Sequence, residues 1–263
     1  KVGNVWKMEE IAYDEKTVIN NMRSLVDLKG KRVLELGGNL NEDIVRECGV
    51  VEWVSVDPMK EDYISKDRVY KCYKMPLLDF KLLEGHFDCV YSSNALEHVN
   101  NLRQCLMYIY NSLKPSGGFF AHFGPIWSAP DGHHLENVKL KDGTILNFWD
   151  NNIIPKWYHL LYGKGNLKEF LSSKLSEDDA KTVVDYIYES NYLNRLFFRD
   201  YVNCFLDTGF EIKELLTTGL IDYEMKDYYK SNYEDSEARE LLKKTYGNDD
   251  YDCRDIMVLL RRP

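Results

Sequence analysis

The sequence of 263 residues is short of positive charge: 34 Lys and Arg stand against 43 Asp and Glu, and the net charge is −9. A protein that binds duplex nucleic acid needs a basic face to displace counterions, so this balance argues against that class. It leaves room for a local basic pocket that takes an anionic small molecule. No apolar run approaches the roughly 18 residues that cross a bilayer, so no membrane span is expected.

Paired cysteine motifs are also missing, because no two of the six cysteines form a CxxC pair. We expect them to be small core residues in a reducing cytosol, not a disulfide framework or a zinc site. No signal peptide pattern opens the sequence, which favours a cytoplasmic location. The first residue is Lys1 and not Met, which leaves open a longer native chain. The cysteines are Cys48, Cys72, Cys89, Cys105, Cys204 and Cys253.

What the sequence does contain is core-forming: 44% of its residues are hydrophobic and 13% are aromatic, which rules out wholesale disorder. Apolar strand patterns alternate with helical patterns through the first half, as is typical of a doubly wound, mostly parallel α/β sheet. Two further strands near the C-terminus suggest a terminal strand pair on the same sheet. Strands are predicted at 32–36, 51–57, 69–73, 87–92, 119–123, 210–216 and 255–261, and helices within 8–28, 41–48, 102–113, 176–190 and 223–246.

A glycine turn follows the first predicted strand, at the point where a doubly wound sheet binds nucleotide-like cofactors. The dinucleotide pattern G-x-G-x-x-G fails there, because Asn39 and Glu42 stand where it needs its second and third glycines after Gly37. A pyrophosphate also needs a positive helix N-terminus, whereas Glu42 and Asp43 make this one acidic. A nicotinamide-dependent oxidoreductase is therefore disfavoured, although it remains an alternative.

An acidic turn suits a cofactor that is cationic and has no phosphate, and S-adenosylmethionine is such a molecule. Here the sequence resembles the class I S-adenosylmethionine-dependent methyltransferases, whose first motif reads E-x-G-x-G-x-G. Glu35 and Gly37 match that motif, while Asn39 and Asn41 replace its other glycines. Asn is the non-glycine residue best suited to a left-handed backbone, so the turn can survive. The same departure keeps a non-catalytic scaffold with this fold as a further alternative.

Two later segments resemble the same family. Residues 86–99 end in the letters LEHV, like the family's fourth strand and its following loop, and Lys114–Gly118 resembles the turn into its fifth strand. The resemblance implies a doubly wound, seven-stranded Rossmann-like sheet with a mostly helical insertion after the fifth strand. It assigns 1–123 and 209–263 to the cofactor-binding core and 124–208 to an inserted acceptor-binding cap.

The resemblance also implies which residues bind the cofactor. Asp57, followed by Pro58, would accept hydrogen bonds from the ribose hydroxyls. Met75 and Pro76 would cover the adenine, although Lys74 stands where the family has an acid. The remaining implied cofactor-binding residues are Glu35, Gly37, Gly38, Asn39, Ser92, Ser93 and Asn94.

The insertion carries the candidate acceptor site. Its segments Gly132-His133-His134 and Trp157-Tyr158-His159-Leu160 resemble parts of methyltransferases encoded with bacterial surface-polysaccharide (capsule) genes, including those that methylate capsular phosphoramidate. The acceptor implied is small and anionic or linked to a sugar. His133 and His134 are the candidate catalytic residues, with His134 favoured because Gly132 lets the chain turn. Candidate acceptor-binding residues are Trp127, His159, Arg195 and Arg199.

Each histidine also has a plain structural interpretation. A metal site on His133, His134 and His159 is disfavoured, because no acidic partner has a diagnostic spacing and adjacent residues in an extended segment point apart. No metal is therefore expected, and His98 reads either as a base or as a helix-start residue. A sugar hydroxyl would need a base such as histidine, whereas a phosphate-type oxygen is already charged and needs only orientation by arginines. The sequence leaves the acceptor and the oligomeric state open.

Overall fold

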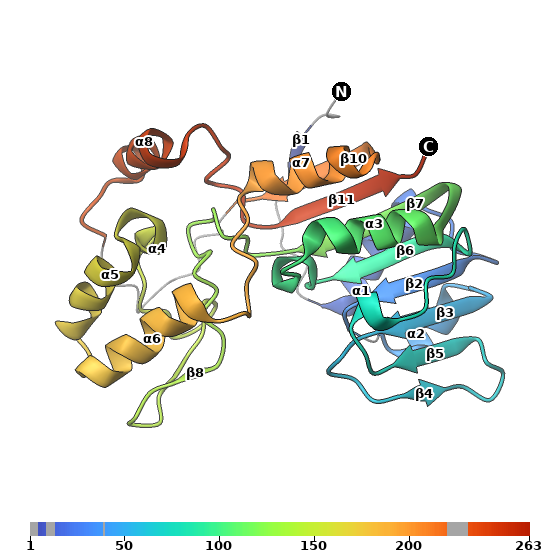
Figure 1. The fold of residues 1–263 in the computed structure, drawn as a ribbon, viewed down its shortest axis with the longest axis horizontal. Helices are drawn as coiled ribbons and strands as arrows, with labels where there is room; N and C mark the ends of the chain where they lie inside the picture. Colours follow the sequence, from blue (N-terminus) through green and yellow to red (C-terminus); the bar gives the residue numbers. More distant parts are fainter. Residues whose placement is uncertain (1–4, 9–13, 39, 220–230) are drawn as a thin grey trace. The chain divides into compact units, whose positions relative to one another are not determined.

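The computed structural model describes residues 5–8, 14–38, 40–219 and 231–263, and its chain divides into two compact units (Figure 1). The first unit consists of Lys1–Phe123, Tyr201–Thr218 and Asp255–Pro263, and the second of Gly124–Asp200 and Gly219–Arg254. The sequence predicts instead that residues 201–208 belong to the insertion and residues 219–254 to the core. Packing explains the difference, since Tyr201 contacts Phe123 with ring centroids 4.9 Å apart, whereas Leu242 shares a cluster with Trp157.

The first unit is built on a nine-stranded sheet in the order β1-β10-β11-β7-β6-β2-β3-β5-β4. Seven of these strands were predicted. The two additional ones lie at the edges, where β1 pairs parallel with β10 and β4 pairs antiparallel with β5. β11 runs antiparallel to both β10 and β7, as expected for a terminal strand pair. The strands are β1 (Val5–Met8), β2 (Arg32–Leu36), β3 (Glu52–Val56), β4 (Tyr63–Ile64), β5 (Tyr70–Tyr73), β6 (Phe87–Ser93), β7 (Leu113–Phe123), β10 (Glu211–Thr218) and β11 (Ile256–Arg261).

Helices of the first unit pack on this sheet through buried apolar side chains. In α1 (Glu15–Leu25), Val18, Ile19 and Met22 join one core cluster with Trp53 of β3. The Asp14 side chain caps the helix by accepting from the Thr17 N–H, so it begins at Glu15 and not near Met8. Other elements of this unit are α2 (Glu42–Glu47), η1 (Leu77–Asp79), η2 (Leu96–His98), α3 (Leu102–Ser112) and most of α7 (Phe198–Thr208).

The second unit has its own hydrophobic clusters. Its helices begin only at Tyr158, and residues 124–157 contain just the two-residue strands β8 (Val138–Lys139) and β9 (Ile145–Leu146). A mostly helical insertion therefore does not describe this first part. The predicted helix at 223–246 begins at Asp235, and residues 220–230 lie outside the described residues. The helices are α4 (Tyr158–Leu161), α5 (Gly163–Ser172), α6 (Glu177–Glu189) and α8 (Asp235–Tyr246).

The structure also bears on the cysteines and on the expectation of no membrane span. None of the six cysteines is in a disulfide, and five of them are buried while Cys204 is half-buried. Among the described helices, none combines the length and apolar character that a membrane crossing requires.

Candidate functional site

The turn after β2 is shaped by two glycines with left-handed backbones, Gly37 (φ 69°) and Gly38 (φ 103°). The Gly37 N–H donates to the Val56 carbonyl at 3.1 Å, which holds the turn against the end of β3. A Cβ on Gly37 would lie 2.5 Å from the Cβ of Ala95, so only glycine fits beside the loop after β6. Ala95 is a residue that sequence reasoning missed. Asn39 lies outside the described residues.

Glu35 holds this turn in place through hydrogen bonds to its buried side chain. Its carboxylate is 3% exposed and accepts hydrogen bonds from the Leu40 N–H at 2.9 Å, the Trp53 indole at 2.8 Å and the Ser55 hydroxyl. Burial raises the pKa of Glu35 to about 7, although these hydrogen bonds act in the opposite direction. Glu35 is therefore a positioning residue that ties the turn to β3, and not the direct electrostatic partner that the motif suggested.

Asp57 stands at the end of β3 and faces the same turn. Its two carboxylate oxygens accept from the backbone N–H groups of Gly38 and, at 2.6 Å, of Met59. A carboxylate has about four lone-pair sites, so two remain for the hydroxyls of a ligand. The structure thus brings Gly37, Gly38 and Asp57 together as the sequence predicted.

The Gly37–Gly38 turn and Asp57 together form a site that we call the cradle. The end of β6 lies on its other side. The Ser92 hydroxyl is buried and donates to the Leu36 carbonyl at 3.0 Å, so it joins β6 to β2 and does not face a ligand. Asn94 is exposed, has a left-handed backbone (φ 49°) and donates its N–H to the His122 carbonyl at 2.8 Å. Ser93 and Asn94 are therefore the members of this group that remain accessible.

Apolar side chains flank the cradle at the ends of β3 and β5. Met75 donates its N–H to the Tyr73 carbonyl at 3.0 Å, and Pro76 precedes η1. Met59, next to Pro58, is 83% exposed and Leu78 is 44% exposed, which is unusual for large apolar residues. Sequence reasoning missed Met59, although its position just after the end of a predicted strand could have indicated it.

These residues fit S-adenosylmethionine better than a dinucleotide. Because β2, β3, β5 and β6 are parallel, their carboxyl ends meet at one edge of the sheet. The cradle there combines a carboxylate for hydroxyl groups with exposed apolar surface for a flat ring. Asn41 caps α2 by accepting from the Asp43 N–H at 2.8 Å, and Glu42 and Asp43 fill its first turn, so a phosphate would meet negative charge.

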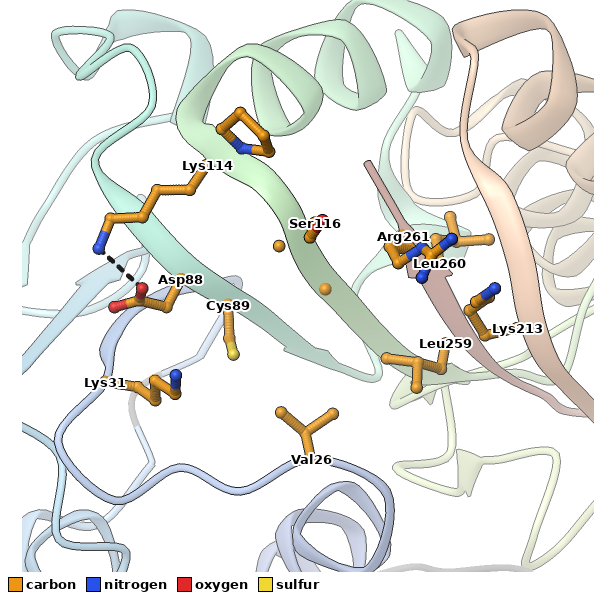
Figure 2. A pocket seen from close by; sticks show the side chains of 13 residues that line it. Val26, Lys31, Asp88, Cys89, Lys114, Ser116, Lys213, Leu259, Leu260 and Arg261 are labelled. Carbon is orange, nitrogen blue, oxygen red and sulfur yellow. Dashed lines mark hydrogen bonds and ion pairs between the residues drawn. The ribbon is translucent and has the colours of Figure 1, made fainter. Parts of the chain in front are cut away.

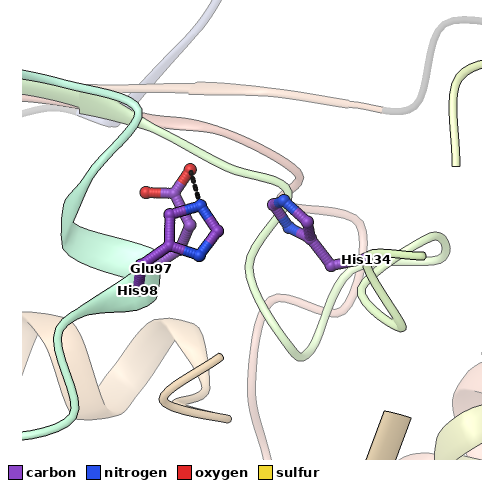
Figure 3. A group of neighbouring side chains, drawn as sticks. All are labelled: Glu97, His98 and His134. Atoms are coloured by element: carbon purple, nitrogen blue, oxygen red, sulfur yellow. Dashed lines mark ion pairs between the residues drawn. The ribbon is translucent and has the colours of Figure 1, made fainter. Parts of the chain in front are cut away.

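Next to this edge, η2 carries a buried acid beside a histidine. Glu97 is 2% exposed, and its carboxylate lies 3.8 Å from the His98 Nε2 (Figure 3). The His98 N–H donates to the Ala95 carbonyl at 3.0 Å, which closes the turn at the start of this segment. His98 is the last residue of η2, so it does not start a helix, although its backbone is hydrogen-bonded into the fold.

In the second unit, the segment that follows the cis Gly124–Pro125 bond is buried and not a surface loop. Asp131 forms an ion pair with Arg254 at 2.8 Å, and both side chains are almost wholly buried. Gly132 has no room for a side chain, since a Cβ would lie 2.3 Å from the Ile126 carbonyl oxygen. The histidines that follow are therefore held by a rigid, enclosed backbone.

His133 and His159 form a buried pair with complementary nitrogens. The His133 Nδ1 accepts from the Leu135 N–H at 3.2 Å, so its proton is on Nε2. The His159 Nε2 lies 2.8 Å from the Trp127 carbonyl and must donate, which leaves its Nδ1 as an acceptor. Neither the His133 Nε2 nor the His159 Nδ1 has a hydrogen-bond partner among the described residues, and the ring centroids are 5.8 Å apart. Burial lowers the pKa of His159 to about 4 and that of His133 well below its usual value, so both rings are neutral.

His134 has different neighbours from His133, as expected for adjacent residues. Its backbone is left-handed (φ 49°), its Nδ1 donates to the Pro125 carbonyl at 3.1 Å, and its ring lies 4.6 Å from that of Phe148. Tyr192 contacts its other side, with centroids 5.8 Å apart.

The two arginines predicted to bind the acceptor are used elsewhere. Arg195 donates to the carbonyls of Ile187 and Ser190 at 2.9 and 2.8 Å, near the end of α6. Arg199 pairs with Asp249 at 3.7 Å. Only Arg195 keeps a link to the histidine pair, because its guanidinium lies 5.8 Å from the ring of Trp127, whose ring is 4.7 Å from that of His159.

Comparison with known proteins gives the first unit its class. Residues 36–121, which hold the glycine turn, Asp57 and Ser92–Asn94, match the family model described as "Methyltransferase domain". Residues 36–121 form a methyltransferase domain. No curated protein matches the chain.

Solved structures agree with this methyltransferase domain at the level of the fold. A candidate S-adenosylmethionine-dependent methyltransferase from Listeria monocytogenes is similar with a TM-score of 0.50 and 15% identity, over 94% of this chain and 96% of that one. The [4+2]-cyclase SpnF has a TM-score of 0.50 and 9% identity, over 100% and 88%. An S-adenosylmethionine-dependent methyltransferase from Mesorhizobium loti has a TM-score of 0.49 and 16% identity, over 92% and 96%. At such low identity the likeness extends to the fold alone.

Proposed function

We propose that this methyltransferase takes its methyl group from S-adenosylmethionine and transfers it to an oxygen atom of a small anionic or sugar-linked acceptor. The main support for this cofactor is the cradle at the ends of β2 and β3, where Asp57 faces the Gly37–Gly38 turn inside the matched domain. Bound there, S-adenosylmethionine supplies an electrophilic methyl group with a neutral thioether as leaving group. The domain match and this cradle together support the enzyme class and its cofactor.

The second unit supplies the proposed acceptor-binding residues. Its histidine pair suits an oxygen acceptor, because the neutral His159 has an open lone pair on Nδ1 and His133 has an open N–H on Nε2. One hydroxyl can donate to the first nitrogen and accept from the second. S-adenosylmethionine bound in the cradle would supply the methyl group, and the His159 Nδ1 would take the proton of the acceptor hydroxyl.

This assignment changes the roles proposed from the sequence. His159 becomes the candidate base, His133 the candidate donor to the same oxygen and Trp127 the residue that orients His159. His134 remains a competing base. Arg195 and Arg199 are less suited to hold an anion than the sequence suggested, because backbone carbonyls and Asp249 already engage them.

A role in surface-polysaccharide synthesis is supported by the Gly132-His133-His134 and Trp157–Leu160 motifs alone. In that setting the acceptor would be a sugar-linked precursor, and a sugar phosphoramidate is one example. The cytoplasm is the compartment in which such precursors and S-adenosylmethionine meet.

Calorimetric titration tests the cofactor. We expect S-adenosylmethionine and S-adenosylhomocysteine to bind and NAD not to bind. Binding of NAD alone would contradict the proposal and favour an oxidoreductase, and binding of none of the three would favour a non-catalytic scaffold.

The acceptor is tested by measuring S-adenosylhomocysteine formation with a panel of sugar nucleotides and sugar phosphoramidates. If His159 is the base, the rate should be flat above about pH 5, because burial holds the pKa of this residue at about 4. A rise through an ordinary histidine pKa near 6.5 would instead indicate a base other than His159. Wild-type rates in both His159→Gln and His133→Gln would show that the pair is only structural.

A further inference from the structure

A cavity of about 510 Å³ lies at the opposite ends of the strands from the cofactor cradle, within the first unit (Figure 2). It is formed where the loop before β2, the start of β6, the turn into β7, the start of β10 and the end of β11 converge. Lys31 and Lys114 stand on one side and Lys213 and Arg261 on the other, with Ser116 of β7 between them.

The charge of this cavity is opposite to that of the whole protein. Four basic side chains surround it, against one acid that lines it, Asp88, and one that pairs at its rim, Glu211. Asp88 accepts from the Lys114 Nζ at 2.7 Å, and Glu211 accepts from Arg261 at 2.6 Å and Lys213 at 3.2 Å. Lys31 is half-buried and has no ion pair of its own in the part of the chain that the structure describes. Two positive charges are therefore left over in a protein whose net charge is −9.

The pairing between neighbouring strands is irregular at the same place. Pairing of β6 with β7 shifts register between Phe87 and Cys89, and pairing of β10 with β11 shifts between Ile212 and Glu214. The residues at these two irregularities, Asp88 and Lys213, both line the cavity. β-Bulges re-aim side chains and are frequent beside functional sites.

One residue at the rim of the cavity, Ser116, has an unfavourable backbone conformation. Ser116 has a left-handed conformation (φ 63°) although it has a Cβ, and its side chain is exposed. Next to it, a Cβ on Gly117 would lie 2.8 Å from the Lys114 carbonyl oxygen and 3.0 Å from that of Asp88. Non-glycine residues with such backbones cost free energy and cluster at functional sites.

We infer that this cavity is a second ligand site, which binds a small phosphorylated molecule. The excess of two positive charges matches a doubly charged phosphate group. The floor is formed by Val26, Cys89 and Leu259, and it offers apolar surface to the rest of the ligand. Ion pairs as exposed as those of Lys213 and Arg261 with Glu211 are weak, so an incoming anion can replace the carboxylate.

Pyrophosphate is the simplest probe, titrated at constant ionic strength while the backbone amide signals of the full chain are followed by NMR. We expect saturable shifts at Ser116, Gly117 and Gly118. Lys31→Gln should weaken binding about tenfold, the effect of losing one charge-assisted hydrogen bond. Glu211→Gln should strengthen it, because Lys213 and Arg261 are released from their partner.

Lys16→Gln is the matched control, since Lys16 is an exposed lysine of α1 outside the cavity. It should bind pyrophosphate as the wild type does, and all three variants should keep their affinity for S-adenosylmethionine. If Lys31→Gln does not fold, Lys31→Arg should fold and retain binding. Equal losses in Lys16→Gln and Lys31→Gln, no saturable shift, or shifts confined to residues 37, 38 and 57 would overturn the inference.

Discussion

At the scale of single residues, the clearest difference between motif and structure is Glu35. The motif predicts it as a cofactor-binding residue, but its oxygens accept hydrogen bonds from Leu40, Trp53 and Ser55. Its raised pKa follows from burial, which no local pattern reveals because it depends on what β3 places beside β2. The acid supports the turn that we propose as part of the cofactor site.

Glu35 should make the protein less stable as pH rises. Its pKa is about 7 in the folded state and near 4.5 in the unfolded chain, so the folded state binds more protons between these values. The contribution to stability is complete below pH 4.5 and is lost through pH 7, by an amount of order 3 kcal/mol. Urea unfolding from pH 5 to 8.5 should show the wild type losing stability relative to Glu35→Gln. Glu47→Gln, at an exposed position of α2, should run parallel to the wild type.

Gly132 gives a second test at this scale. Replacing it with Ala would force a Cβ to within 2.3 Å of the Ile126 carbonyl oxygen and 2.4 Å of that of Trp127. We expect Gly132→Ala to lower the free energy of unfolding by about 2–3 kcal/mol, as overpacking of a rigid site does. Gly165→Ala is the control, because Gly165 lies inside α5 with no atom within 4 Å and should gain helix propensity. Similar stability of the two variants would contradict the enclosed backbone.

At the scale of elements, Asp57, which directly follows β3, provides the test of the cofactor cradle. Asp57→Ala should weaken S-adenosylmethionine binding at least about tenfold, because charge-assisted hydrogen bonds contribute about 1.5–3 kcal/mol. Asp57→Asn should lie between, since its amide oxygen can still accept from Gly38. Both affinities are measured by calorimetry, with circular dichroism to verify the fold.

Asp27→Ala is the matched control for Asp57. Asp27 also accepts a backbone N–H two residues ahead, from Lys29 at 3.0 Å, in an exposed turn before β2, at the opposite end of this strand from the cradle. Its replacement should leave cofactor affinity unchanged. An unchanged affinity in well-folded Asp57→Ala would remove Asp57 from the site.

A helix or strand can be predicted from the sequence when its own residues carry the pattern that defines it. The seven inner strands carry their apolar pattern within a few residues, so each could be read from the sequence. β1 could not, because Val5–Met8 becomes a strand by pairing with Leu215–Thr218, more than two hundred residues away. β4 has only two residues and is too short for any pattern. The assignment of α7 and α8 to units also depended on contacts that no segment encodes alone.

At the scale of the whole molecule, the second unit should limit stability on the acid side. Burial lowers the pKa of His159 to about 4, below its unfolded value near 6.5. The unfolded chain therefore takes up protons first, and this contribution to stability is present above pH 6.5 and is lost as pH falls through 4. His133 acts in the same direction.

The measurement is acid unfolding of the wild type and His159→Gln, followed by circular dichroism. The variant should lose less stability between pH 6.5 and 4, since its side chain does not titrate and can still donate to the Trp127 carbonyl. An unchanged slope in His159→Gln would mean that the ring is charged in the folded state.

The pairing of β7 with β11 has a consequence for synthesis on the ribosome. Residues Phe119–Phe123 of β7 form an apolar strand, and the strand that covers its outer edge spans Ile256–Arg261, much later in the sequence. A nascent chain therefore carries this edge uncovered until residues 256–261 have been synthesised. Uncovered apolar edges recruit other strands, so chains that end early should aggregate and not fold as half-proteins. Since the first unit is assembled from three separate segments, no single cut of the gene would yield it intact.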